Sequence, residues 1–266
     1  ADNNTAVGYQ SAYNNTTGAY LTAVGYGSLL NNTTGSYNTG VGLYALRGNT
    51  TAEHNTGLGY NAGYALTTGG ANTAIGSSAL RSTTTGAANS ASGYAALFTN
   101  VTGSSNTAQG FGALYYNTTD SNSAIGAYAL FNNSSGTYNV AVGRDALYSN
   151  TTANSNTAVG YQAGYANTTG DTMAAFGYWA LKSNTTGRNT GIGAYALATN
   201  TTGTNNNAFG DSALYLNTTG NYNTAVGYSA LLYNTTASNN TAVGYQAGYR
   251  SEEHTSELQS RLHLVC

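Results

Sequence analysis

The sequence predicts an all-β protein, a parallel β-solenoid (a β-roll or β-helix) of about fifteen 17-residue coils. Three observations predict this fold. A short unit recurs fifteen times, its length suits one coil of short strands and turns, and its residues alternate with the period of a strand. Helical repeat units are about 33–47 residues long, so a unit this short leaves no room for a helical hairpin.

One glycine marks every copy of the repeat. Successive glycines are 17 residues apart in twelve intervals and 16 apart in two. The copies run from Asn4 to Tyr249 with the consensus Asn-Thr-Ala-Val-Gly-Tyr-x-Ala-Leu-x-x-Asn-Thr-Thr-Gly-x-x, whose positions we number one to seventeen. The glycines at position five are Gly8, Gly25, Gly42, Gly59, Gly76, Gly93, Gly110, Gly126, Gly143, Gly160, Gly177, Gly193, Gly210, Gly227 and Gly244.

Composition separates this chain from an ordinary globular domain. Charged residues make up 6% of the 266 residues, where about 25% is usual, and there is no proline. The 24 tyrosines also distinguish it from disordered chains, which are poor in aromatic residues. The net charge of −2 without a basic cluster gives no reason to expect a nucleic-acid partner, and no apolar run is long enough to predict a membrane span.

Each unit is expected to contain a strand, a second short strand and a turn. Positions two, four and six (Thr, Val and Tyr in the consensus) alternate with small residues at positions three and five, which is the period of a strand. Alanine and leucine at positions eight and nine fit a second short strand. The Asn-Thr-Thr-Gly segment at positions twelve to fifteen supplies the turn, because glycine is free to take positive φ.

Stacked coils place identical residues above one another in columns. Asparagine occupies position one in thirteen of fifteen copies, from Asn4 to Asn240, and a second asparagine column occupies position twelve. Such columns can hydrogen-bond amide to amide. Valine and leucine are expected to fill a thin core. Tyrosines at position six, such as Tyr9 and Tyr26, are expected to stack their rings.

The run Asn-Thr-Ala-Val-Gly at residues 240–244 resembles the head repeats of trimeric autotransporter adhesins, which carry an Asn-Ser-Val-Ala-Ile-Gly type motif. It is also similar to repeats of phage and bacterial fibre proteins. The resemblance covers residues 3–249. It implies a left-handed parallel β-roll that associates with copies of itself and works in attachment.

The repeat domain is expected to span residues 1–249, and residues 250–266 differ from it sharply. This tail holds three of the nine acidic residues, two of the seven basic residues and the only cysteine, Cys266. Residues 250–260 resemble the conceptual translation of a sequencing-library adapter. We therefore expect a non-native or disordered tail, with a natural capping helix from Ser251 as the alternative.

Residue types that carry chemistry are few and scattered. Outside the tail the one histidine is His54, and acidic residues such as Glu53, Asp145 and Asp211 fall at different positions of the unit. No paired-carboxylate site, phosphate-binding loop or calcium-binding nonapeptide follows from these spacings. We expect no catalytic residue, no metal and no cofactor, and we expect Glu53 and His54 to lie on a solvated surface.

The Asn-x-Ser/Thr sequence at position twelve is the first candidate functional feature. It fits either a turn with an asparagine ladder or a row of glycans, N-linked on asparagine or O-linked on threonine. The candidate glycosylation residues are Asn15, Asn32, Asn49, Asn100, Asn117, Asn133, Asn150, Asn167, Asn184, Asn200, Asn217 and Asn234.

The small residues at positions three and five are the second candidate feature. If the valine between them points inward, they form a flat outer strip that another sheet can approach closely. The alternative is that they lie inside a very thin core or at a corner. Representative residues of this candidate self-packing strip are Ala6, Gly8, Ala23, Gly25, Ala158, Gly160, Ala225 and Gly227.

Threonine columns at positions two, thirteen and fourteen are the third feature. Regular threonine on a flat β-solenoid face can order water in an ice-like array, although strand parity places positions thirteen and fourteen on opposite sides. Together these observations favour a non-enzymatic extracellular structural or adhesive rod, a segment of a self-assembling fibre or filament. Its expected partners are copies of itself, with surface glycans and ice as further candidates. An ice-binding solenoid is the alternative function.

Overall fold

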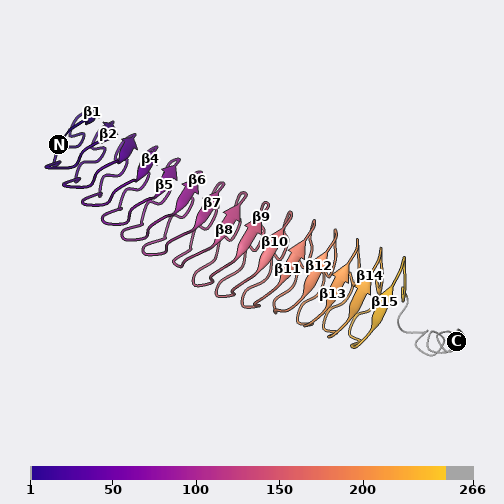
Figure 1. Ribbon diagram of the computed structural model, residues 1–266. Helices are drawn as coiled ribbons and strands as arrows, with labels where there is room; N and C mark the ends of the chain where they lie inside the picture. Colours follow the sequence, from indigo (N-terminus) through magenta and orange to yellow (C-terminus); the bar gives the residue numbers. More distant parts are fainter. Residues whose placement is uncertain (1, 250–266) are drawn as a thin grey trace, which may run out of the picture. The chain divides into compact units, whose positions relative to one another are not determined.

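The computed structural model describes residues 2–249, and none of these residues is helical. The chain divides into two compact units, Ala1–Asp145 and Ala146–Cys266. Each unit is a parallel β-solenoid in which every coil contributes one three-residue strand, so the predicted fold class is confirmed (Figure 1). The predicted tail, residues 250–266, lies outside the described residues.

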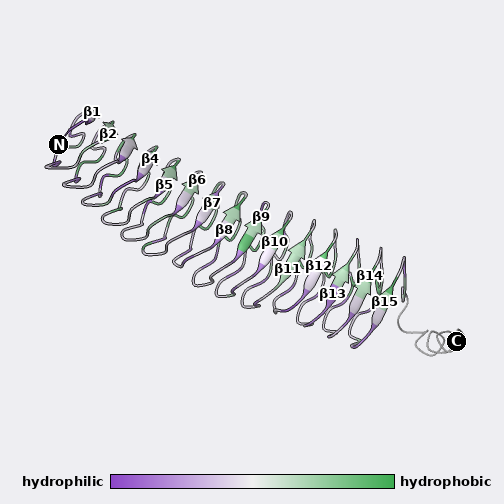
Figure 2. Ribbon diagram, in the orientation of Figure 1, coloured by the Kyte–Doolittle hydropathy of each residue, from purple (hydrophilic) through white to green (hydrophobic). Residues whose placement is uncertain are grey.

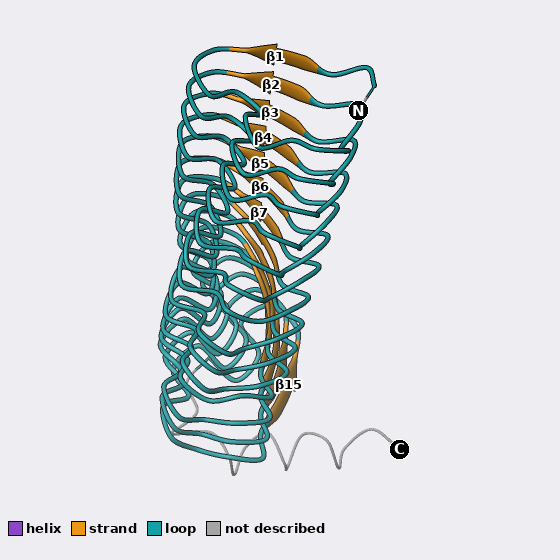
Figure 3. Ribbon diagram, turned by 90° about the vertical axis from the view of Figure 1, so that its left-hand side faces the viewer, coloured by secondary structure: helices purple, strands orange, loops and turns teal. Residues whose placement is uncertain are grey.

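In the first unit nine strands pair in parallel and in chain order. Equivalent residues of neighbouring coils are partners, as Thr5 with Thr22 and Val7 with Val24. Figure 3 shows β1 to β7, in orange, along one side of the coils. Loops and turns, in teal, form the rest of each coil. The strands are β1 Thr5–Val7, β2 Thr22–Val24, β3 Thr39–Val41, β4 Thr56–Leu58, β5 Thr73–Ile75, β6 Ser90–Ser92, β7 Thr107–Gln109, β8 Ser123–Ile125 and β9 Val140–Val142.

The second unit repeats this arrangement with six strands. Neighbouring strands are again parallel and in register, with Thr157 opposite Ala174 and Val159 opposite Phe176. The strands are β10 Thr157–Val159, β11 Ala174–Phe176, β12 Thr190–Ile192, β13 Asn207–Phe209, β14 Thr224–Val226 and β15 Thr241–Val243.

The middle residue of each strand points into the coil, and its two neighbours point outward. Ala23 and Ala74 are completely buried, whereas Val41 and Ile75 are 37% and 40% exposed. The expectation that valine points inward and fills the core is therefore wrong. The interior is too narrow for it, because a β-carbon at Gly57 would lie only 2.8 Å from Cγ of Leu46 on the opposite wall.

Positions five to nine form turns, not the predicted second strand. Tyr44 at position seven and Leu46 at position nine have left-handed φ values of 58° and 50°. Their N–H groups consequently bond to coils on opposite sides: Tyr44 donates to the carbonyl of Tyr26, and Leu46 donates to the carbonyl of Ala62, each at 2.9 Å. Because alternate N–H groups point to the preceding and the following coil, they find carbonyl partners there that a narrow coil does not offer within itself.

The glycine at position five is required by two separate constraints. Gly42 has a φ of 131°, which L side chains rarely adopt. A β-carbon there would also lie 2.6 Å from the carbonyl oxygen of Gly59 in the next coil. Together these two constraints account for glycine in every copy.

The core of each unit is a thin set of columns. Alanines at positions three and eight and leucines at position nine, such as Leu46, Leu114 and Leu197, are fully buried. Asparagines at positions one and twelve are also buried. Figure 2 shows green on most of the strands, where the exposed aliphatic residues lie, and more purple in the loops.

Candidate functional site

The first and third residues of each strand form a surface that we call the outer strand face. It is described separately for β1–β9 and for β10–β15. Parallel pairing places like residues side by side, as Thr22 beside Thr39 and Val24 beside Val41. None of the strand residues in either unit is charged. Each unit thus presents an uncharged face made of a mainly hydroxyl column and a mainly apolar column, with exceptions such as Val140 and Asn207 in the first column and Ser92 and Gln109 in the second.

The threonine hydroxyls on this face are free of protein partners. Among the described residues, none of the strand threonines makes a side-chain hydrogen bond. Threonines at position thirteen differ, because their hydroxyls donate to carbonyls of the next coil, as Thr33 to Thr50 and Thr50 to Thr67, both at 3.0 Å. The threonines at position thirteen therefore link neighbouring coils, whereas the hydroxyls of the strand threonines are available to water or a ligand.

Aromatic columns flank the outer strand face at position six. Tyr9 stacks on Tyr26 with ring centroids 5.2 Å apart, and Tyr161 stacks on Tyr178 at 5.4 Å, as the repeat predicts. A hydrogen bond with Tyr44 raises the pKa of the Tyr26 hydroxyl. Reduced hydration, with smaller contributions from neighbouring tyrosines, raises the pKa of Tyr178. These columns extend the surface beyond the strands, with charges only at Arg144 in the first unit and Asp211 in the second.

Another aromatic column lies at position seventeen, where Tyr20, Tyr37 and His54 stack in sequence. The ring centroids are 4.9 Å apart at both steps, and the planes are within 4° of parallel. His54 and Glu53 are both exposed, which confirms their expected place on a solvated surface. His54 therefore continues a ring stack and lies beside no acidic or metal-binding cluster in the described part of the chain.

Charged side chains do not converge in residues 2–249. The one ion pair among them joins Arg144 and Asp145 at 3.4 Å. An open hollow lies beside the shorter coil of the second unit. There the side-chain carboxylate of Asp171 accepts a hydrogen bond from the backbone N–H of Asn154, and the backbone carbonyl of Asp171 accepts one from the backbone N–H of Arg188. These groups already bond one another. No helix in this part of the chain is long and apolar enough to span a membrane.

The candidate self-packing strip does not form an outer surface. Ala23, Ala158 and Ala225 are completely buried, because position three faces the interior. The neighbouring Gly25, Gly160 and Gly227 are half-buried, and the backbone that approaches each of them belongs to the next coil of the same chain. In the first described coil, Ala6 and Gly8 are exposed. The alternative interpretation of the sequence is therefore the one observed: the position-three alanines lie in a thin core, and the position-five glycines lie at a corner.

The position-twelve asparagines form the predicted ladder inside the coils. Asn49 donates one amide N–H to Oδ1 of Asn32 at 2.6 Å and the other to the carbonyl of Ala52 at 3.1 Å. Asn38, from the position-one column, donates to the same carbonyl at 2.7 Å. The buried sequon asparagines, eleven of the twelve candidates, have no exposed amide to carry a glycan in the folded chain. Buried members are Asn32, Asn49, Asn100, Asn117, Asn133, Asn150, Asn167, Asn184, Asn200, Asn217 and Asn234.

Asn15, the remaining candidate, belongs to the first coil and is partly buried. Its Nδ2 donates to the carbonyl of Gly18 at 2.9 Å, and its Oδ1 accepts from Asn32 at 2.9 Å. Asn15 is therefore part of the ladder. One of its two amide N–H groups is thus used within the protein.

Sequence reasoning missed the outer strand face, although one signal in the repeat indicates it. Position four accepts Ser92 in β6, Gln109 in β7 and Phe176 in β11, whereas position three accepts only alanine and glycine. A position that tolerates serine, glutamine and phenylalanine is typical of an exposed site, because a packed interior is sensitive to volume and polarity. No protein-family model, curated protein or solved structure matches this chain.

Proposed function

We propose that the protein is a non-enzymatic structural and adhesive repeat protein that works outside the cell or at its surface. Its outer strand face binds copies of the same chain. The observation that carries the proposal is the aliphatic column at position four, which stays 37–42% exposed in residues such as Val41 and Ile125. Burying apolar surface yields about 25 cal/mol per Å², so a long column favours association.

The face is suited to pairing with itself. A second copy carries the same hydroxyl and aliphatic columns at the same interstrand spacing, so side chains of two faces can interdigitate along many strands. Stacked sheets pack about 10 Å apart in this way. Two identical faces that meet shifted along the strand stack each leave strands uncovered for a further copy, so the contact can continue as a filament and does not close at a dimer. The absence of charge from the strand residues removes the repulsion that would oppose it.

The resemblance of residues 240–244 to adhesin head repeats supports an extracellular place and a role in attachment. The scattered charged residues support a binding role over catalysis, because general acid–base chemistry needs groups held within hydrogen-bond reach of one substrate.

Negative-stain electron microscopy and light scattering across a concentration series test the proposal. We expect filaments or bundles whose mass rises with protein concentration. A chain that stays monomeric at every concentration would contradict self-association.

Ice binding is the second candidate, and the unpartnered strand threonines favour it. In β1 to β5 every strand begins with threonine and ends with an aliphatic residue, so hydroxyl and methyl groups alternate on a regular grid. Such a grid can order water in an ice-like array. The triple variant Thr22→Lys, Thr39→Lys and Thr56→Lys should abolish ice-crystal shaping, whereas Thr34→Lys, Thr51→Lys and Thr68→Lys, at exposed positions of the same coils, should retain it. Ice crystals that grow unshaped in the presence of the unmodified protein would rule this function out.

A further inference from the structure

Pairs of exposed tyrosines from neighbouring coils are held ring against ring. The centroids of Tyr20 and Tyr37 are 4.9 Å apart with planes at 4°, and the two side chains are about half exposed. In the second unit the centroids of Tyr228 and Tyr245 are 5.5 Å apart with planes at 11°, and both rings are exposed. Each pair joins residues exactly one coil apart in sequence, so the fold itself sets this proximity.

Stacked phenols are prepared for oxidative coupling. A phenol that loses an electron and its hydroxyl proton becomes a phenoxyl radical, whose unpaired electron extends to the carbon next to the C–O carbon. Two such radicals join at these carbons. The fold already holds the two rings together. Coupling therefore does not pay the entropy that bringing two separate reactants together would cost.

We propose that Tyr20–Tyr37 and Tyr228–Tyr245 are oxidative cross-linking sites, at which a haem peroxidase and hydrogen peroxide join the two rings by a carbon–carbon bond. One hydrogen peroxide accepts two electrons and two protons from the two phenols and becomes two waters. The proton on each coupled carbon then moves to the oxygen of its own ring. The product is a dityrosine, lighter than the two tyrosines by two hydrogen atoms.

The cross-link ties one coil to the next. It restricts the conformations of the unfolded chain, as a disulfide does. The sequence has one cysteine, which cannot form a disulfide within the chain, but it has 24 tyrosines that can be cross-linked. Links within one chain strengthen the solenoid whether or not chains associate, so this inference does not rest on the proposed function.

Peroxidase treatment of the dilute, folded chain tests the proposal, with dityrosine fluorescence and mass spectrometry of tryptic peptides as readouts. Tyr228 and Tyr245 lie in one tryptic peptide, between Arg188 and Arg250, and Tyr20 and Tyr37 both precede Arg47. A link within a pair therefore gives a single peptide that has lost two hydrogen atoms. A link between chains gives two joined peptides. Fragmentation of the single peptide locates the linked residues.

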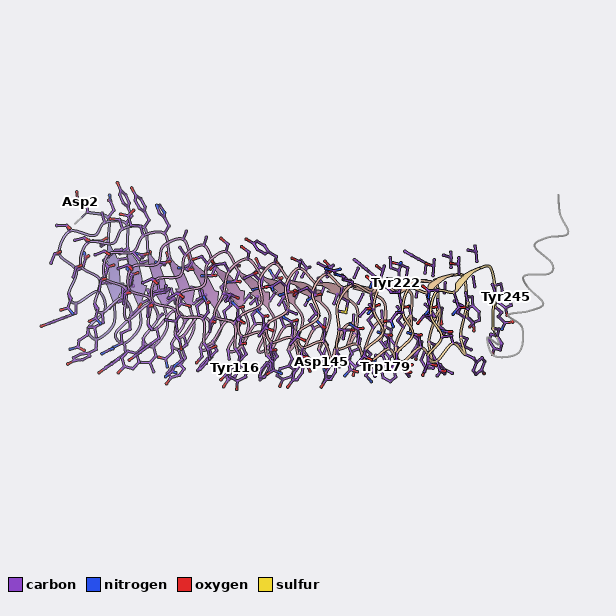
Figure 4. All side chains as sticks on the ribbon, turned by 90° about the horizontal axis from the view of Figure 1, so that it is seen from below. Asp2, Tyr116, Asp145, Trp179, Tyr222 and Tyr245 are labelled. Atoms are coloured by element: carbon purple, nitrogen blue, oxygen red, sulfur yellow. The ribbon has the colours of Figure 1, made fainter. Side chains whose placement is uncertain are left out.

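Two phenylalanine variants make the result specific. Tyr245→Phe keeps a stacking ring without a phenol and should abolish the link that fragmentation assigns to Tyr228. Tyr222→Phe, in the same peptide, should leave that link intact, because Tyr222 is exposed but stacks on no ring within the described residues (both are labelled in Figure 4). Equal yield in the urea-unfolded chain, links at Tyr222, or products joined only between chains would each overturn the proposal.

Discussion

Met173 occupies the space beside Gly164 that the position-nine leucine fills in most coils. A β-carbon at Gly164 would collide with Cε of Met173 and would lie 3.1 Å from Cδ2 of Leu147. Met173 is buried and stands where most copies have the position-one asparagine. Gly63 and Leu66 show the same exchange, since a β-carbon at Gly63 would lie 2.9 Å from Cδ1 of Leu66. At these two places, departures from the repeat are thus coupled in pairs.

This coupling predicts a non-additive mutant cycle. Gly164→Leu alone should destabilise the chain by overpacking against Met173, and Met173→Asn alone should cost about 2–4 kcal/mol because it leaves a cavity. The double variant restores the consensus and should recover about 1–3 kcal/mol of the summed loss. Urea unfolding followed by circular dichroism measures all four proteins. Effects that simply add would show that the two residues do not share one space.

Much of the fold follows from the sequence, but the direction of side chains does not. The spacing of the glycines predicts the coils and the place of each strand, and the asparagine columns predict the ladders. Alternation alone leaves open whether Ala23 or Val24 points inward, because either choice satisfies a period of two. The answer depends on the width of the coil, which is set by the left-handed turn at residues such as Tyr44 and Leu46. Left-handed conformations are uncommon for tyrosine and leucine, so the residue types at these positions do not indicate them.

The asparagine ladder should contribute substantially to stability. Asn49→Ala removes two donors and leaves the buried Oδ1 of Asn32 without its donor, so we expect a loss of about 1–3 kcal/mol or more. Asn14→Ala is the matched control, because its one side-chain bond, to Asn31 at 3.3 Å, is exposed. The control should change the free energy of unfolding by less than about 0.5 kcal/mol. Equal effects in chemical denaturation would mean that the ladder is not a source of stability.

Glycine at position five should be irreplaceable, whereas glycine elsewhere in the coil should not. Gly42→Ala forces a β-carbon against the next coil at a φ of 131°, so we expect a loss of at least about 1–3 kcal/mol. Gly70→Ala has ordinary φ, and its nearest contact would be the carbonyl of Glu53 at 3.0 Å. Other copies carry alanine at that position, as Ala19 and Ala87 do. Thermal unfolding should therefore separate the two variants clearly, and similar midpoints would count against the close coil-to-coil approach.

The most direct test of the outer strand face as a binding surface is sedimentation velocity on two matched triple variants. Val7→Lys, Val41→Lys and Ile75→Lys place charges on the face in alternate coils, and Thr17→Lys, Thr51→Lys and Thr85→Lys place the same charges at exposed positions of those coils away from the face. Circular dichroism checks that both variants fold. We predict that the face variant remains monomeric across the concentration range while the control associates as the unmodified chain does. Association of the face variant equal to that of the control would contradict self-association through the outer strand face.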